Sequence, residues 1–402
     1  MYLTSLSLTN FRLFNRLEVE IPRNLLLLVG GNAQGKTSFL EGIHYLATLD
    51  SPQVQSDRQF VNFLALKDEI PVSRLVAGYQ RNDGLHKLEI RLIIDPGVNG
   101  NGRLRKELLI DGIKRPQMDV FGQIYSVLFL PQMMRILEGG PEERRRFLDT
   151  ALSQAFGGYA RQLSEYSQAI SQRNALLKQI SERGGDTAQL NYWDDAIIMN
   201  GATIIHTRIH AIQEFELLSG KEFKKLTGEK EQMHLIYLPA YNPFPSSNGQ
   251  LTFDLRTQTR MGKITIEEIQ EGFKKQLLEV RNEEITRGVT TIGPHRDDFR
   301  VLGNGVDLGI FGSRGQIRSA IMSMKLAEMD WLKEKTGEWP ILLLDETLAE
   351  LDNQRRMDLL NTLMNCNQAI LTTTDLNLFS SEFTRNCAVW QMNGGKINLT
   401  VG

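Results

Sequence analysis

The feature that most constrains this chain is a glycine-rich segment that directly follows a continuous apolar run. Residues 25–29 are all leucine or valine, which is the pattern of a strand covered on both faces. The chain then reads Gly30, Gly31, Asn32, Ala33, Gln34, Gly35, Lys36, Thr37 and Ser38. This order matches G-x-x-x-x-G-K-[ST], and the residues after it can open a helix. Strand, loop and helix together predict a P-loop in an α/β fold.

The residue types of this loop suit a nucleoside triphosphate. Glycines let backbone N–H groups turn inward around phosphates. Lys36 is expected to neutralise the β- and γ-phosphates and to act in catalysis, and Thr37 offers a hydroxyl to Mg2+. We therefore expect residues 30–38 to bind ATP together with Mg2+.

A second motif, made of two acids, lies far along the chain after another buried strand. Residues 341–344 are aliphatic, and Asp345 and Glu346 follow them. Asp345 is expected to hold Mg2+ through its water shell, and Glu346 is placed to polarise the attacking water as a general base. The pair resembles a Walker B motif.

The long separation of Lys36 from Asp345 selects among P-loop architectures. ABC and SMC ATPases insert material between these two motifs and carry a signature shortly before the second. Here Ser313, Gly315 and Gln316 resemble the core of that signature, in which a serine hydroxyl and glycine N–H groups meet a γ-phosphate at a helix N-terminus. The resemblance implies an α/β P-loop NTPase with an ABC/SMC-like head.

The same resemblance implies a nucleotide site that is split between two copies. In this class the signature does not reach the P-loop of its own chain, so Ser313 would complete the site of a partner in an ATP-bridged homodimer. Asp352 resembles the D-loop residue at that interface, and Gln132 a Q-loop residue that senses Mg2+ and the γ-phosphate. Residues 373–375 read Thr-Thr-Asp where the class has a switch histidine, so we expect slow hydrolysis.

The periodicity of apolar residues divides the chain into a head and an arm. Alternating residues near 5–21 and 87–94 predict strands, and Asp111-Gly112 predicts a hairpin, so the first part is a mixed β lobe. From Glu142 the spacing becomes helical and predicts one helix to Arg183, a second one running back, and a third over 264–281. We expect an ATPase head from residues 1–140 and 285–402, and a short helical arm domain from 141–284.

Composition excludes several classes of protein. The formal net charge is −2, so any DNA contact requires a local basic patch. Two cysteines without a CxxC pair support neither a disulfide framework nor a zinc site, and no apolar stretch is long enough to span a membrane. We expect a cytoplasmic protein. Candidate DNA contacts are Arg103, Arg105, Lys106, Lys114, Arg115, Arg144, Arg145 and Arg146.

Further segments resemble the RecF family of recombination mediators over nearly the whole chain. They are residues 8–12, 140–149, 172–178 and 193–194 and, most specifically, the Gly-Pro-His-Arg-Asp-Asp segment at 293–298. The resemblance implies weak, DNA-stimulated ATPase activity and ATP-dependent binding of double-stranded DNA at gap junctions. It also implies roles in DNA repair, replication and the SOS response with RecR, RecO and RecA. Gly312 stands where the family usually has alanine, and Arg314 is a bulky basic residue at a variable position of the signature, so both bear on rate and dimer affinity rather than on fold.

Two other functions remain open on the sequence. An SMC-like structural tether would use the same ATPase, but an insertion of this length is too short for a long coiled coil. An OLD-type nuclease-associated ATPase would need an additional acidic metal-binding domain, and none follows Glu346. A transporter subunit would need the switch histidine and membrane segments.

Overall fold

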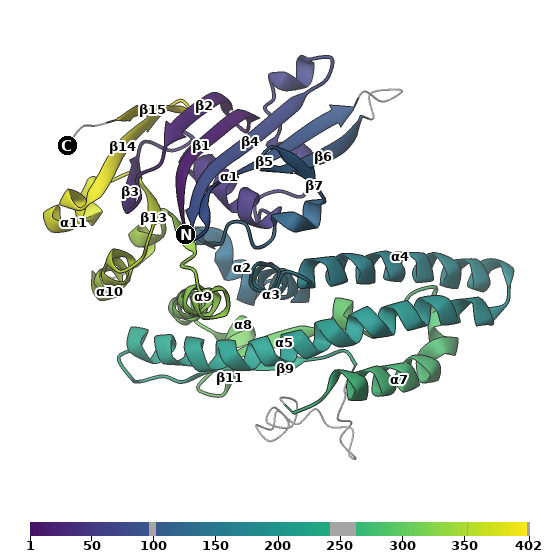
Figure 1. Cartoon of the computed structure of the whole chain (residues 1–402). Helices are drawn as coiled ribbons and strands as arrows, with labels where there is room; N and C mark the ends of the chain where they lie inside the picture. Colours follow the sequence, from purple (N-terminus) through teal and green to yellow (C-terminus); the bar gives the residue numbers. More distant parts are fainter. Residues whose placement is uncertain (96–101, 242–262, 352, 400–402) are drawn as a thin grey trace. The chain divides into compact units, whose positions relative to one another are not determined.

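The computed structural model describes residues 1–95, 102–241, 263–351 and 353–399 (Figure 1). The chain divides into two compact units, the first made of Met1–Met133 with Glu328–Gly402 and the second of Met134–Ala327. This division follows packing, and it groups residues 285–327 with the helices of the second unit. The functional boundaries of 1–140 with 285–402 for the head, and 141–284 for the arm, stay a prediction.

A largely parallel sheet positions the phosphate loop in the first unit. Its strand order is β15-β14-β3-β13-β12-β8, and only the pairing of β15 with β14 is antiparallel. The strands β3, β8, β12 and β13 are buried along their whole length, as their apolar runs predict. The bounds are β3 (Leu25–Val29), β8 (Ser126–Phe129), β12 (Ile341–Asp345), β13 (Ala369–Thr373), β14 (Cys387–Asn393) and β15 (Lys396–Leu399).

An antiparallel sheet of order β2-β1-β4-β5-β6-β7 forms the rest of this unit's β structure. Its strands are β1 (Tyr2–Phe11), β2 (Phe14–Glu20), β4 (Val72–Arg81), β5 (Gly84–Asp95), β6 (Arg103–Ile110) and β7 (Ile113–Arg115). The predicted strands and the hairpin at Asp111-Gly112 are confirmed, and both turn residues have positive φ (50° and 80°). Helix α1 (Lys36–Thr48) packs against strands of both sheets. The mixed α/β head predicted from the sequence is therefore confirmed.

Short elements complete the first unit. The segment between α1 and β4 contains the turns η1 (Asp57–Phe60) and η2 (Ala65–Lys67). The helix α9 (Arg314–Thr336) crosses the boundary between the two ranges. The others are η4 (Gln117–Val120), η5 (Pro131–Met134), η8 (Thr347–Glu350), α10 (Asn353–Met364), η9 (Leu376–Leu378) and α11 (Ser381–Arg385).

The second unit combines long helices with a small sheet of order β11-β10-β9. Helices α4, α5 and α7 run side by side (Figure 1). The helices are α2 (Arg135–Glu138), α3 (Pro141–Ala155), α4 (Tyr159–Arg183), α5 (Leu190–Leu226), α7 (Ile266–Arg287) and α8 (Leu308–Phe311). The strands are β9 (Met233–Leu238), β10 (Asp298–Gly303) and β11 (Val306–Asp307), and the turns are η6 (Thr187–Gln189) and η7 (Pro294–Arg296).

The single helix predicted from Glu142 to Arg183 is wrong. Helix α3 ends at Ala155 and α4 begins at Tyr159, with Phe156, Gly157 and Gly158 between them. Two adjacent glycines cost backbone entropy in a helix and allow the chain to turn, whereas the apolar spacing continues through the break and hides it. The predicted second and third helices are confirmed as α5 and α7.

Buried ion pairs join the helices of the second unit to its sheet. Arg208 is 1% exposed and pairs with Asp149 and Asp297 at 2.9 and 3.1 Å. Arg144 is 4% exposed and binds Asp298 through two nitrogens, at 2.6 and 3.0 Å. Asp297 and Asp298 are the two acids of the Gly-Pro-His-Arg-Asp-Asp segment, so both of them form ion pairs that stabilise the fold of this unit. Arg144, once a candidate DNA contact, is buried and committed to Asp298.

Candidate functional site

The phosphate loop joins β3 to α1 through a backbone that needs small residues. Gly35, directly before α1, has φ 107°, and Ala33 has φ 59°, so both occupy the left-handed region. A Cβ on Gly30 would lie 2.4 Å from the carbonyl oxygen of Met392, which explains the glycine there. Gly31, Asn32 and Ala33 are exposed.

Lys36 points back over this loop rather than into solvent. Its side chain is 4% exposed, and Nζ donates to the carbonyl oxygens of Gly30 at 2.9 Å and Gly31 at 2.8 Å. The same Nζ lies 3.0 Å from Oε1 of Glu346. The ammonium is therefore desolvated and held where phosphates would enter, beside the proposed general base.

Asp345 links the two motifs through hydroxyl groups. Thr37 Oγ1 donates to Asp345 Oδ2 at 2.8 Å, and Thr372 Oγ1 donates to Asp345 Oδ1 at 2.8 Å. Burial raises the pKa of the Asp345 carboxyl, the charge of Glu346 adds to that rise, and the two hydroxyl bonds oppose it. A bound cation would stabilise this carboxylate.

The oxygen donors here fit Mg2+. A carboxylate and a hydroxyl are hard ligands, and Mg2+ in ATPases is typically held by one or two such groups together with substrate phosphates. Within the described ranges, no group of three or more histidine, cysteine or acidic side chains is arranged to hold a metal. Thr37 and Asp345 are the groups that would hold Mg2+ in this chain.

Glu346 combines a strained backbone with an accessible side chain. Its φ is 47°, unusual for a residue with a side chain, and its N–H donates to Thr372 Oγ1 at 3.0 Å. The side chain is 38% exposed, whereas Asp345 beside it is 5% exposed. The two acids are thus assigned different environments: one is buried for a cation and one is open to water.

Two other predicted positions, Gln132 and the site of the missing switch histidine, have different surroundings. Gln132 is exposed and lies three residues after Phe129 of β8, which pairs with Leu344 of β12, the residue before Asp345. Asp375, near the position of the missing histidine, caps the turn η9 by accepting from the N–H of Asn377 at 2.8 Å.

Gln34 joins the phosphate loop to a hairpin through hydrogen bonds of its side chain and its carbonyl oxygen. Its Oε1 accepts from the N–H of Gly394 at 2.6 Å, and its carbonyl oxygen accepts from the N–H of Gly395 at 3.0 Å. Its Nε2 donates to the carbonyl oxygen of Asn32 at 3.1 Å. The turn between β14 and β15 therefore clasps the loop from outside, a role that the motif does not reveal.

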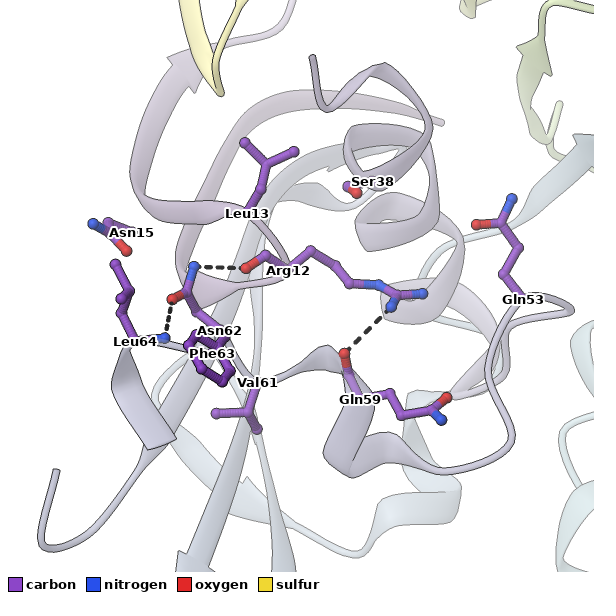
Figure 2. Close-up of a pocket in the computed structure, with 10 residues that line it drawn as sticks. All are labelled: Arg12, Leu13, Asn15, Ser38, Gln53, Gln59, Val61, Asn62, Phe63 and Leu64. Carbon is purple, nitrogen blue, oxygen red and sulfur yellow. Dashed lines mark hydrogen bonds between the residues drawn. The ribbon is translucent and has the colours of Figure 1, made fainter. Parts of the chain in front are cut away.

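A pocket of about 670 Å³ lies beside the start of α1, with Ser38 in its wall (Figure 2). Arg12 crosses it and binds Glu41 through two nitrogens, at 2.8 and 2.9 Å. Asn62 Nδ2 donates to the carbonyl oxygen of Arg12 at 2.6 Å. The lining residues are Arg12, Leu13, Asn15, Ser38, Gln53, Gln59, Val61, Asn62, Phe63 and Leu64.

The sequence did not reveal three parts of this site. Residues 53–64 have no clear periodicity, because they form turns rather than regular structure. Arg12 carries no signal of its pairing with Glu41. Thr372 follows a buried apolar run as Asp345 does, and that shared position at adjacent strand ends is the one signal that could have identified it.

The signature residues form a helix start in the second unit. Ser313 Oγ accepts from the N–H of Gln316 at 3.3 Å, and the Gln316 side chain accepts from the N–H of Ser313 at 3.1 Å, which is a capping box before α9. Ser313 and Gly315 are exposed, and no atom lies within 4 Å of a Cβ on Gly315. The N-terminus of this long helix is open to solvent. Asp352 lies outside the described residues.

Gly312 is required by its surroundings. A Cβ there would lie 2.4 Å from the carbonyl oxygen of Leu308 and 3.0 Å from Ile317. The departure from the expected alanine therefore matches the local packing of this chain. Arg314 is exposed.

Sheet order, phosphate loop, paired acids and signature define a P-loop ATPase of the ABC/SMC class. Residues 5–234 match the family model described as an AAA domain. The solved Smc head domain of Pyrococcus furiosus with an extended coiled coil aligns with a TM-score of 0.51 at 14% identity, covering 99% of this chain and 96% of that one. In the described ranges, no helix is both long and apolar enough to cross a bilayer.

Closer relatives carry one description. The DNA replication and repair protein RecF of Roseiflexus castenholzii is 36% identical over 99% of both chains, and that of Herpetosiphon aurantiacus is 34% identical over 99% of both. A solved structure of the recombination mediator RecF with ATP, in the RecFOR pathway, aligns with a TM-score of 0.83 at 28% identity over 100% of this chain and 98% of that one. The chain belongs to the RecF family of DNA replication and repair proteins.

Replacing Gln34 tests the clasp on the phosphate loop. Gln34→Met keeps the length of the side chain but removes the acceptor for Gly394, at a cost of about 1–2 kcal/mol. We expect ATP affinity, measured by calorimetry, to fall about tenfold while the melting temperature without nucleotide changes little. Gln172→Met, on an exposed position of α4, is the matched control. Equal ATP affinity of the two variants would remove the positioning role from Gln34.

Proposed function

We propose that this chain is an ATP-dependent DNA-binding switch, in which two copies close around ATP and hydrolyse it slowly. The observation that supports this most is the open start of α9. Ser313 and Gly315 present a helix N-terminus, an anion-binding element, with nothing packed over Gly315. In a symmetric pair each such end would meet the γ-phosphate held by the other copy's loop.

Phosphate binding would rearrange the charges around Lys36. Its ammonium now contacts two loop carbonyls and Glu346. Phosphate oxygens would compete for that ammonium and release the Glu346 carboxylate, which is then free to accept a proton from water. Thr37 and Asp345 would hold Mg2+, which would supply charge neutralisation for the departing phosphate. Gln132 is proposed to sense the metal and the γ-phosphate from the adjacent strand end.

The nucleoside end of ATP is proposed to enter the pocket beside Ser38. This pocket adjoins the first turn of α1 and combines apolar side chains with amide groups, the mixed lining that small-molecule sites use. Glu41 holds the side chain of Arg12, and Asn62 donates to the Arg12 carbonyl oxygen (Figure 2), so the wall is preorganised.

The residues that stand where the class has its switch histidine support slow hydrolysis of ATP. Asp375, near the position of the switch histidine, accepts a hydrogen bond from the N–H of Asn377 within a turn. Glu346 is thus proposed as the sole general base in the described part of the site. Slow hydrolysis of ATP would set the lifetime of the dimer rather than support rapid turnover.

The family assignment motivates the proposed partners. The relatives are described as DNA replication and repair proteins, and one solved relative as a mediator in the RecFOR pathway. We propose that the ATP dimer binds double-stranded DNA, favouring gap junctions, and helps RecR and RecO to load RecA in the cytoplasm. A long-range tether is less suitable, because α4 has 25 residues and extends only about 37 Å.

The proposed DNA surface depends on basic residues that remain available. Arg105, Lys106 and Lys114 all pair with acids, whereas Arg103 and Arg115 are exposed. Arg145 donates to the carbonyl oxygen of Asp297 at 2.7 Å. Pairing reduces the attraction of these side chains for phosphate, so we propose that DNA binding requires the combined charge of two copies.

ATP should convert monomers into dimers. With Mg2+ and ATP, sedimentation velocity should show the mass of a dimer, and without nucleotide the mass of a monomer. Glu346→Gln should prolong the dimer and slow hydrolysis by about 10²-fold or more, because the base is lost while Lys36 and Thr37 still bind ATP.

Ser313→Arg is the matched control for this prediction. It should bind ATP with normal affinity yet remain monomeric, since its own phosphate loop is intact. An ATP-independent mass for the parent chain would contradict the split-site proposal, and undiminished hydrolysis in Glu346→Gln would remove that residue from the role of base.

Duplex DNA binding should depend on ATP and on salt. The observed affinity should fall linearly with the logarithm of salt concentration, with a slope of about −0.9 for each phosphate neutralised. Fluorescence anisotropy with a gapped duplex measures this, and Lys36→Ala, which should not retain ATP, is the control. Binding that is equally strong for the parent and for Lys36→Ala would contradict an ATP-dependent switch.

A further inference from the structure

Two exposed apolar patches lie beside the two parts of the proposed nucleotide site, one next to the signature and one next to the phosphate loop. The first, here named the signature patch, consists of Ile310 and Phe311, which are 63% and 73% exposed and stand just before Ser313. The second, the pocket patch, consists of Leu13, Phe63 and Leu64, which are 38%, 74% and 55% exposed. Exposed apolar groups gathered at a functional site mark a surface that becomes covered.

The signature patch is held rigidly in solvent. Leu308 is 2% exposed and packs close to Gly303, and the N–H of Gly312 donates to the carbonyl oxygen of Leu308 at 3.0 Å. A Cβ on Gly309 would lie 2.6 Å from the carbonyl oxygen of Leu137. Since the turns on both sides of Ile310 and Phe311 are fixed, their exposure is not the result of a loose loop.

The pocket patch is fixed in a similar way. Asn62 Oδ1 accepts from the N–H of Leu64 at 2.8 Å, and the N–H of Asn62 donates to the carbonyl oxygen of Asn10 at 2.8 Å. A Cβ on Gly35 would lie 2.9 Å from Leu13, so this leucine stands directly on the phosphate loop. Figure 2 shows Leu13, Phe63 and Leu64 around the same pocket as Ser38.

We propose that the signature patch of one copy docks on the pocket patch of a second copy and forms an apolar contact beside each ATP. This inference rests on the proposed function, because the partner is another copy of this chain. The argument is continuity: Phe311 lies two residues from Ser313, and Leu13 touches the phosphate loop that Ser313 of the other copy must approach. Two-fold symmetry repeats the contact, so each dimer has two apolar seals.

The apolar contact would increase the affinity of the two copies for each other beyond the contribution of the phosphate contacts. Ser313 and Gly315 supply polar contacts to an anion, and these also compete with water. Aromatic residues buried at the centre of an interface typically dominate its energetics, and they exclude water from the polar contacts around them. Phe311 is the residue suited to that role, since it is large, held in place and adjacent to the signature.

The test is made in chains that carry Glu346→Gln, here called the parent, because their ATP dimers should persist. Phe311→Ser in that background should weaken ATP-dependent dimerisation about tenfold or more by sedimentation equilibrium. ATP affinity of the monomer should be unchanged. Phe311→Leu should largely retain the dimer, and Leu217→Ser, which alters a 76% exposed leucine on α5, should have no effect.

A crosslink tests which patches meet. With a mild added oxidant to accept the two electrons, a chain with Phe311→Cys mixed with a chain carrying Phe63→Cys should form an ATP-dependent disulfide, whereas Phe311→Cys alone should not crosslink to itself. The native thiols Cys366 and Cys387 give little background, because burial raises the pKa of each to about 12.

The outcomes separate the two hypotheses. A parent that never dimerises with ATP contradicts the proposed function itself. A parent that dimerises while Phe311→Ser matches Leu217→Ser, with no mixed crosslink, overturns the apolar seal alone. Loss of DNA binding by Phe311→Ser with dimerisation intact also overturns it and assigns the patch to a nucleic-acid surface.

Discussion

The site depends above all on the position of Asp345. Its two oxygens are shared between Thr37, from the helix after the phosphate loop, and Thr372, from the neighbouring strand. Those hydroxyls fix a buried carboxylate at the point where three segments, distant in sequence, converge at one edge of the sheet. Burial raises its pKa, so the arrangement favours a cation there. Lys36 and Glu346, which lie 3.0 Å apart, are positioned at the same edge of the sheet.

A second constraint holds the phosphate loop from outside. The turn between β14 and β15 binds both the side chain and the carbonyl of Gln34, and Leu13 lies against Gly35. A glycine-rich loop has many accessible conformations, and an external clasp reduces the entropy lost when phosphates bind. The turn between the C-terminal strands β14 and β15 is thus coupled to the phosphate loop in this chain.

Local chemistry made much of this predictable from sequence. The phosphate loop, both buried strands and the paired acids follow from patterns of neighbouring residues, and the class of fold follows from the order and separation of these motifs. The rest depends on partners far apart in the chain. The function of Gln34 requires Gly394 and Gly395, and the fate of Arg144 requires Asp298. The break between α3 and α4 was missed because apolar spacing persists through Gly157 and Gly158.

The most direct test of the split site mixes two inactive chains. Lys36→Ala lacks a working phosphate loop but keeps Ser313, and Ser313→Arg lacks the signature but keeps Lys36. Each alone should hydrolyse no ATP. Mixed in equal amounts, they should recover up to about half of the normal ATPase rate, because only mixed dimers form and one of the two composite sites in each is intact. Full activity of Ser313→Arg alone, or no recovery in the mixture, would contradict a site shared between two copies.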